Sequence, residues 1–216
     1  METTATATAA VKPRAPALVR ELNARHRDKL LAHFLSLGTE DRLLRFGSII
    51  NDDVVRQYVA SIDFQRDTVF GVFGNRLELI GAGHLAYLKQ DNAKEGGGVA
   101  ELGVSVSSGQ RDHGIGSTLF ERAAIRCRNA GVSTLYMHCL VQNGAMMHIA
   151  KKAGMQVQYA YGEADAYLTL PPASTATVFA EAVQGQLADF DYALKRNLAQ
   201  ARRTVHSFWN LDKETA

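Results

Sequence analysis

The sequence has few of the residues that would place it in several common protein classes. It has two cysteines, which cannot form a disulfide framework, so Cys127 and Cys139 are expected to be small buried residues of a reducing compartment, and we expect the protein to be cytoplasmic. No apolar run approaches membrane-spanning length, and we expect no membrane partner. The 24 basic and 22 acidic residues nearly balance, so the charge gives no argument for binding nucleic acid.

Several catalytic and ligand motifs are also absent from the sequence. No Gly-Lys-Ser or Gly-Lys-Thr triplet is present, as a Walker A loop requires, and no Gly-x-Ser-x-Gly elbow exists. Four histidines, His84, His113, His138 and His148, show no metal-ligand spacing with the two cysteines. We therefore expect no metal.

The length and composition favour one domain with appendages. The 216 residues are many for one small domain and few for two. Residues 1–16 are rich in Thr and Ala and are expected to form a flexible tail. Residues 17–172 carry strand and helix patterns, and Pro171 and Pro172 are expected to end the sheet domain. Residues 173–216 are expected to form a C-terminal helical extension.

The chain is organised around residues 99–143, which predict a strand, a glycine turn, a helix and a second strand. Along the first strand, Leu102, Val104 and Val106 share one face and Glu101 lies on the other. Small and apolar residues then recur at helical spacing until Gly131 ends the helix. The second strand covers residues 134–141.

The turn between this strand and helix has the features of an anion site. Gly114 and Gly116 let the backbone approach a ligand closely, and the first N–H groups of the helix point outward with the positive end of its dipole. Arg111 and His113 add side-chain donors. The predicted ligand is a phosphate or pyrophosphate.

The spacing distinguishes among phosphate-binding designs. A dinucleotide-binding fingerprint would place a small residue at position 119, which is Leu119. The segment from Arg111 to Gly116 instead resembles the Arg/Gln-x-x-Gly-x-Gly/Ala signature of the GNAT (Gcn5-related) N-acetyltransferases. The next strand, Asn143 and the segment Lys152-Ala153-Gly154-Met155 follow that family's order, with Met155 where the family usually has Phe. This resemblance is strongest over residues 65 to 170.

The resemblance implies an α/β fold: a mixed, mostly antiparallel sheet with splayed middle strands and flanking helices. It implies acetyl-CoA as co-substrate, with its pantetheine arm along the backbone of Val104, Ser105 and Val106. Asn143 would contact the cofactor from the end of the second strand. The pyrophosphate would be held by the turn residues Arg111, Asp112, His113, Gly114, Ile115, Gly116 and Ser117.

The resemblance also implies direct attack by an amine on the thioester. Glu101 is the candidate base, although a strand carboxylate in a salt bridge or in solvent is about as common. Many family members place a tyrosine, as acid, where this chain has Ala150. Either the thiolate leaves unassisted, or His148, Tyr136 or Tyr159 supplies the proton, or the protein does not catalyse the reaction.

The flanking segments predict the remaining elements. Helices are expected at residues 28–37, 39–46 with Thr39 as cap, and 52–60 with Asn51 as cap. By resemblance, the helices after the first strand line one side of the acceptor site. A short strand at residues 18–22 precedes them, and a hairpin at 67–73 and 77–88 follows, where Gly81 and Gly83 mark a bulge or a close backbone approach. A loop at 90–98 and a closing hairpin within 155–170 complete the domain.

A stripe of nine residues predicts a long C-terminal amphipathic helix. The stripe either covers a flank of its own domain or forms a homodimer. Its members are Phe179, Val183, Leu187, Phe190, Leu194, Leu198, Ala201, Val205 and Phe208.

Two functions of different class follow from these features. The first is an acyltransferase that moves an acetyl group from acetyl-CoA to a protein lysine or a small-molecule amine. The second is a catalytically weak CoA-binding or sensing module, which Ala150 suggests. The sequence does not identify the acceptor.

Overall fold

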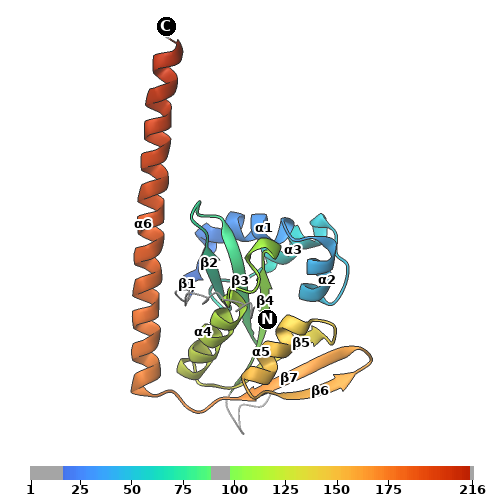
Figure 1. The fold of residues 1–216 in the computed structure, drawn as a ribbon. Coiled ribbons are helices and arrows are strands. Elements are labelled where there is room, and N and C mark those ends of the chain that lie inside the picture. Colours follow the sequence, from blue (N-terminus) through green and yellow to red (C-terminus); the bar gives the residue numbers. More distant parts are fainter. Residues whose placement is uncertain (1–16, 89–97, 215–216) are drawn as a thin grey trace, which may run out of the picture.

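The computed structural model describes residues 17–88 and 98–214, with side chains as far as residue 200. In these ranges a seven-stranded sheet is flanked by helices (Figure 1). The strands are β1 (Val19–Leu22), β2 (Thr68–Phe73), β3 (Leu79–Tyr87), β4 (Gly98–Val106), β5 (Val132–Leu140), β6 (Gln156–Ala160) and β7 (Glu163–Thr169). The helices are α1 (Arg27–Leu35), α2 (Thr39–Phe46), α3 (Asp52–Ser61), α4 (Ile115–Asn129), α5 (Gly144–Lys152) and α6 (Thr175–Glu214), with short 3-10 turns η1 (Ala24–His26) and η2 (Ser108–Gln110).

The two central strands of the sheet diverge. The strand order is β1-β2-β3-β4-β5-β7-β6, and only β4 and β5 run parallel. They pair from Gly98 to Glu101 of β4, where Glu101 lies beside Tyr136. Beyond that point β4 stays paired with β3 as far as Val106, while β5 stays paired with β7. The predicted mixed sheet with splayed middle strands is therefore confirmed.

Hydrophobic side chains pack on both faces of the sheet. On one face α1 and α3 contribute buried residues that include Phe34 and Val59. On the other face α4 and α5 contribute residues that include Leu119 and Ile149. Every residue of β2 is buried, because this strand is covered on both faces.

Both cysteines lie in this core and are free thiols. Burial raises the pKa of the Cys127 thiol to about 12, so it stays protonated and packs as a small apolar group. The prediction that both cysteines are small buried residues is confirmed.

A close approach explains one of the two glycines in β3. A Cβ at Gly81 would lie 2.7 Å from the Cγ2 atom of Ile115, the first residue of α4. A Cβ at Gly83 would meet nothing closer than 3.6 Å, which is ordinary contact. The sheet also has an irregularity beside Gly81, between Val72 and Phe73 of β2. The absence of a side chain at Gly81 thus lets α4 begin directly on the sheet.

The long helix α6 packs on the edge of the domain and extends well beyond it (Figure 1). Polar contacts dominate its inner face: Asp189 pairs with Arg20, and Glu181 pairs with Arg122. Tyr192 adds an edge-on ring contact with Phe73, at 4.7 Å between centroids.

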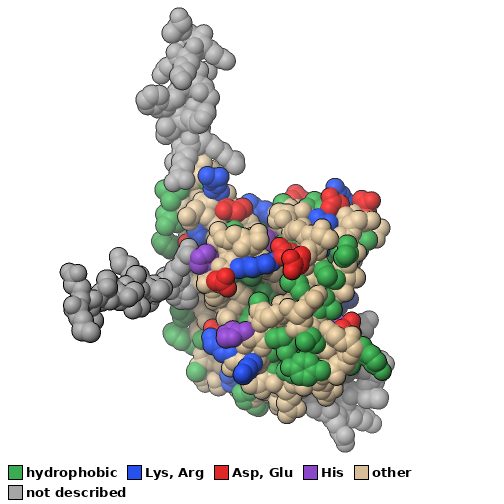
Figure 2. Space-filling view, turned by 45° about the vertical axis from the view of Figure 1, so that its right-hand side comes forward, with side chains coloured by type: hydrophobic (Ala, Val, Ile, Leu, Met, Phe, Trp, Pro, Cys, Tyr) green, Lys and Arg blue, Asp and Glu red, His purple; other side chains and the backbone are tan. Residues whose placement is uncertain are grey.

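The predicted apolar stripe of α6 does not cover its own domain. All six members with described side chains are exposed, including Phe179 at 70% and Phe190 at 71%. Hydrophobic side chains accordingly form the outer edge of the coloured part of α6 in Figure 2. The flank of the domain takes the polar side of the helix instead, because Arg20 and Arg122 offer charges there. The prediction that the stripe covers the domain is therefore wrong for these residues.

The other predicted elements occur within a few residues of their expected positions. Asn51 caps α3, since its side chain accepts a hydrogen bond from the Val54 amide at 3.0 Å. The cap of α2 is Gly38 rather than Thr39, which is already helical. The closing hairpin turns at Tyr161 and Gly162, between β6 and β7. The predicted tail at residues 1–16 and most of the predicted loop at 90–98 lie outside the described residues.

Candidate functional site

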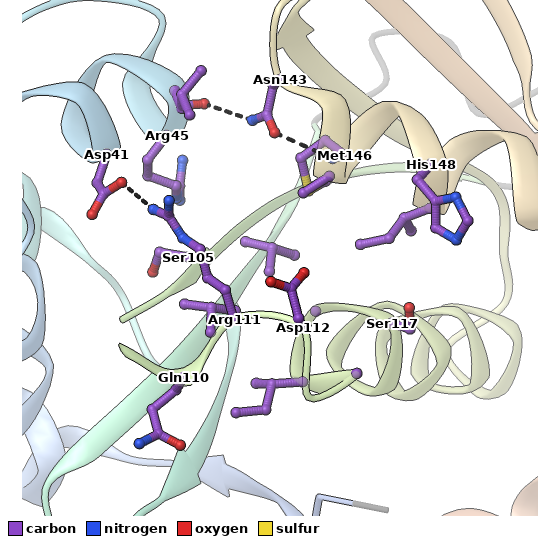
Figure 3. A pocket seen from close by; sticks show the side chains of 18 of the residues that line it. Asp41, Arg45, Ser105, Gln110, Arg111, Asp112, Ser117, Asn143, Met146 and His148 are labelled. Carbon is purple, nitrogen blue, oxygen red and sulfur yellow. Dashed lines mark hydrogen bonds and ion pairs between the residues drawn. The ribbon is translucent and has the colours of Figure 1, made fainter. Parts of the chain in front are cut away.

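A cavity of about 580 Å³ lies beside the unpaired edge of β4. Its walls come from the end of β4, the turn that follows, the start of α4, the start of α5, and α2 (Figure 3). Every residue predicted to bind the cofactor lines it, except His113, which is exposed on the turn outside the lining. The fold therefore brings together segments that lie about 100 residues apart in the chain, from Leu44 to Asn143.

The turn presents backbone N–H groups to this cavity. Asp112 and Gly114 both adopt left-handed backbone conformations, with φ of 61° and 74°. Gly114 is the N-cap of α4 and supplies no side-chain hydrogen bond to the helix. The first amides of α4 therefore have no capping side chain. Such a turn at a helix N-terminus can bind an anion.

The side chain of Arg111 reaches from the turn to α2. Its Nη2 atom forms an ion pair with Asp41, whose side chain is 14% exposed, whereas that of Arg111 is 45% exposed (Figure 3). A guanidinium can bind a carboxylate or a phosphate in the same manner. The pair therefore joins α2 to the turn, and a bound phosphate would compete with Asp41 for Arg111.

Asn143 also connects to α2. Its side-chain oxygen accepts a hydrogen bond from the Met146 amide at 3.2 Å and so caps α5. Its side-chain nitrogen donates to the Leu44 carbonyl of α2 at 3.2 Å. The side chain lines the cavity, but both of its polar atoms already have partners (Figure 3). The second N–H of its nitrogen and the second lone pair of its oxygen remain for a contact with a cofactor.

A buried histidine supports the β4 wall. His33 of α1 is 2% exposed, with its Nδ1 atom 3.0 Å from the Leu79 carbonyl and its Nε2 atom 2.8 Å from the Ser105 hydroxyl. Burial lowers the pKa of His33 to about 4, so the ring is neutral near pH 7. A carbonyl only accepts, so Nδ1 donates and Nε2 accepts from Ser105. Ser105 thus has lone pairs, but no spare proton, to offer a ligand.

The family comparison identifies this arrangement. The family model described as "Acetyltransferase (GNAT) family" matches residues 58–155, which include β4, the glycine turn, α4, β5 and α5. Over these residues, which make up less than half of the chain, the chain is similar to the GNAT family. The resemblance seen in the sequence is thereby confirmed.

Solved structures of N-acetyltransferases, including one described as a GNAT domain, share the fold. The GNAT domain of S. lividans PAT is 18% identical, with a TM-score of 0.59 over 70% of this chain and 89% of that chain. Spermidine N-acetyltransferase from Vibrio cholerae is 18% identical, with a TM-score of 0.54 over 72% and 96% of the two chains. Ribosomal-protein-alanine N-acetyltransferase from Brucella melitensis is 16% identical, with a TM-score of 0.54 over 71% and 99%. No curated protein matches the chain by sequence.

Glu101 lies outside the lining of the cavity. It is partly buried on β4 at the last position that pairs with β5. Leu102 on the other face of the strand packs into the core with α4, as predicted. Glu101 forms no hydrogen bond or ion pair within the described part of the chain. Its carboxylate is therefore available on the face of β4 that α1, α2 and α3 cover.

The candidate acids occupy different environments. Ala150 is fully buried in α5. His148 lines the cavity, whereas Tyr159 is 63% exposed on β6. The hydroxyl of Tyr136 donates to Asp165 at 2.6 Å, and burial, followed by this bond, raises the pKa of Tyr136.

Sequence reasoning missed the contribution of α2 to the site. Asp41, Leu44 and Arg45 all line the cavity, but the segment carries no motif and its sequence indicates only a helix. The resemblance placed the helices after the first strand beside the acceptor. It did not indicate that α2 contacts both β4 and β5 across the point where they diverge.

Two further observations concern metal ligands and membrane-spanning helices. Within the described residues, no three His, Cys, Asp or Glu side chains gather closely enough to hold a metal ion. Nor does any described helix combine the length and apolarity needed to cross a membrane.

Proposed function

We propose that this GNAT domain transfers an acetyl group from acetyl-CoA to a primary amine, either a small-molecule amine or a protein lysine. The observation that supports the proposal is the cavity at the divergence of β4 and β5, with the anion-binding turn at one end. Among the similar structures, one is named for spermidine, a small-molecule amine, and another for an alanine of a ribosomal protein. The match of residues 58–155 to an acetyltransferase family model is consistent with both acceptors.

The residues present fit acetyl-CoA in two ways. Arg111 and the turn amides from Gly114 to Ser117 offer donors for a pyrophosphate. Along Val104, Ser105 and Val106, the edge of β4 that faces away from β3 can bond an extended chain as an added strand would. Because Ser105 donates its proton to His33, its oxygen can accept an amide N–H from that chain.

The proposed chemistry needs a positioned amine, a proton acceptor and a donor for developing negative charge. Acetyl-CoA supplies an activated thioester. Glu101 takes the proton from the amine, because its carboxylate has no partner in the described part of the chain. A backbone N–H among Val104, Ser105 and Val106 stabilises the negative charge on the oxygen.

The protonation of the leaving thiolate has two routes within this proposal. Of the three side chains considered, His148 lines the cavity, whereas Tyr136 donates its proton to Asp165. The thiolate leaves with a proton from His148 or leaves unassisted. A CoA-binding module with little catalytic activity is the alternative function, and the buried Ala150 favours it, because no acid stands at that position.

The decisive experiment mixes the protein with acetyl-CoA and a panel of amines and measures the released thiol. The panel contains polyamines, amino acids and lysine-containing peptides. Amine-dependent thiol release supports the transferase. Tight acetyl-CoA binding with no amine-dependent release across the panel would support the binding module instead.

Three further expectations stay proposals. Residues 17–172 form the acetyltransferase domain and residues 173–216 its extension. A second copy of the chain pairs through the exposed stripe of α6. The protein works in the cytoplasm.

A further inference from the structure

Arg45 is held in a defined position on the surface of β4. Its side chain extends from α2, lines the cavity (Figure 3), and lies directly over Gly103, where any Cβ would collide with the guanidinium. Gly103 is three residues before the end of β4 at Val106, or about 10 Å along the strand. Arg45 is therefore well separated from the turn that we assign to the pyrophosphate.

Aromatic rings surround the guanidinium. Its central carbon lies 5.0 Å from the ring centre of Phe46, 5.7 Å from that of Tyr58 and 5.9 Å from that of Phe34. These rings contact each other edge to face or at a tilt. Packing of this kind holds the cation in place and shields part of it from water.

A chain of hydrogen bonds orients the guanidinium. Asp67 is buried, and the bonds from Arg66 and His84 outweigh the effect of burial and lower its pKa. The carboxylate of Asp67 therefore accepts from His84 Nε2 at 3.1 Å, which leaves His84 Nδ1 to accept from the Tyr58 hydroxyl at 2.8 Å. The Tyr58 oxygen then accepts from Arg45 Nη2 at 2.9 Å. The direction of each hydrogen bond in this series, from donor to acceptor, is therefore determined.

The charge of Arg45 has no counter-ion. In the described part of the chain no carboxylate lies within 4.0 Å of its guanidinium, and the Nε atom is buried without a hydrogen-bond partner. The neighbouring arginines differ: Arg42 pairs with Asp52, and Arg111 pairs with Asp41. Even partial desolvation of a cation without an anion is costly, and a fold that orients one this closely is suited to an anionic ligand.

A carboxylate without a partner lies on the same face of the strand. Glu101 is two residues from Gly103, so its Cα is about 7 Å away and its side chain projects to the same side. Both charges act on the Tyr58 hydroxyl. Burial raises the pKa of this group most, Arg45 lowers it, and Glu101 raises it. Arg45 and Glu101 nevertheless form no ion pair with each other. A cation and an anion without ion-pair partners, at this spacing, can bind the carboxylate and the amine of a zwitterion.

We propose that Arg45 binds a carboxylate of the substrate, and that the acceptor is an amino acid or another amine that carries a carboxylate close to its amino group. The proposal rests on the proposed function, since it sets the amine beside Glu101. A guanidinium would bind the same carboxylate if it came instead on a dicarboxylic acyl group. The acceptor is the source that Glu101 favours, and the experiment has an arm for each source.

The first arm measures binding by calorimetry and does not depend on turnover. The CoA-saturated protein is titrated with amino acids and with the carboxamide of each. Wild type binds at least one amino acid ten- to hundredfold more tightly than its carboxamide, as expected for a hydrogen bond between charged groups. The second arm uses calorimetry on the protein without CoA and compares its affinities for succinyl-CoA and acetyl-CoA.

Three variants separate recognition from folding. Arg45→Met keeps an apolar stem among the aromatic rings and removes the charge, so the preference for the carboxylate disappears. Gly103→Ala places a methyl group where the guanidinium lies and so displaces it, while the backbone at this position has no positive φ and accepts alanine. The variant should reduce the same preference, which provides a test if Arg45→Met folds poorly. Arg56→Met removes an exposed charge from α3 and leaves the preference unchanged.

The outcomes are distinct. Loss of a preference for amino acids in both Arg45→Met and Gly103→Ala supports the proposal as stated. If the two variants lose only a preference for succinyl-CoA over acetyl-CoA, the carboxylate belongs to the acyl group, and the assignment to the acceptor is overturned. Equal affinity of wild type for every acid and amide, and for both thioesters, overturns the proposal altogether. Acetyl-CoA affinity is measured alongside, and its absence would refute the proposed function rather than this inference.

Discussion

Glu101 of β4 and Tyr136 of β5 are the last residues at which the two central strands pair. The strands separate immediately afterwards, and the exposed edge of β4 becomes a wall of the cavity. The same residue thus marks the end of the sheet ladder and carries the unpaired carboxylate. This relationship is why Glu101 is the proposed base.

Replacement of Glu101 by Gln tests that role. The variant keeps the shape of the side chain and loses the proton acceptor, so kcat should fall about 100- to 10,000-fold while acetyl-CoA affinity stays within about twofold. Thiol release and calorimetry measure the two quantities. Glu40→Gln, an exposed change on α2, should alter neither. A Glu101→Gln enzyme with normal turnover would refute the base assignment.

The close approach of Gly81 to α4 predicts a position-specific effect on stability. Gly81→Ala puts a methyl group 2.7 Å from Ile115 Cγ2, which should lower the free energy of unfolding by about 1–3 kcal/mol. Gly83→Ala on the same strand meets only ordinary contacts and should be neutral or slightly stabilising. Urea unfolding of the two variants measures the difference. Equal stability would show that α4 does not rest on Gly81 as described.

The buried His33 predicts a loss of stability in acid. Its pKa falls from 6.5 to about 4 on folding, so the unfolded chain binds the proton more tightly. The stabilising contribution is complete above pH 6.5 and is lost as the pH falls towards 4. Between about pH 7.5 and about pH 5 the loss should be about 2 kcal/mol.

The control for this pH effect is His33→Asn, which can still donate to the Leu79 carbonyl but has no ionisable ring. Its free energy of unfolding should be lower than that of wild type at neutral pH and should depend less on pH over the same interval. Urea unfolding at both pH values gives the comparison. An unchanged pH dependence in the variant would show that His33 is not the group responsible.

The apolar stripe of α6 predicts association between two copies. Leu187 and Phe190 are 52% and 71% exposed, and replacing both by Gln should convert a dimer to a monomer in light scattering. Gln186→Ala changes an exposed residue outside the stripe and should leave the mass unchanged. A wild-type protein that stays monomeric at high concentration would contradict the prediction.

Sequence patterns predicted most of the fold because its elements have strong periodicity and clear boundaries. Asn51, Gly131 and the prolines after β7 end or begin elements through local chemistry, which a sequence displays directly. The glycine turn was equally accessible, because left-handed φ at Gly114 and an open helix start are local properties.

Contacts between distant segments could not be predicted in the same way. Arg45 over Gly103, Asp41 with Arg111, and the bond from Asn143 to α2 each join residues far apart in the chain. The stripe of α6 failed for a related reason: its periodicity was correct, but the partner surface on the domain proved polar. Periodicity identifies an apolar face and does not identify what covers it.

The central claim is that the glycine turn binds the pyrophosphate of acetyl-CoA, and calorimetric titration tests it most directly. Wild type should bind acetyl-CoA tightly and bind S-acetylpantetheine, which lacks the pyrophosphate, far more weakly. Gly114→Ala imposes a side chain at φ 74°, at a cost of about 1–2 kcal/mol. The free turn is expected to relieve this strain by leaving the left-handed conformation, which should weaken acetyl-CoA binding by up to about five- to thirtyfold. Gly109→Ala lies in the same loop, in open space and without positive φ, and should bind as wild type. Equal affinity for the two thioesters, or undiminished binding by Gly114→Ala, would contradict the account.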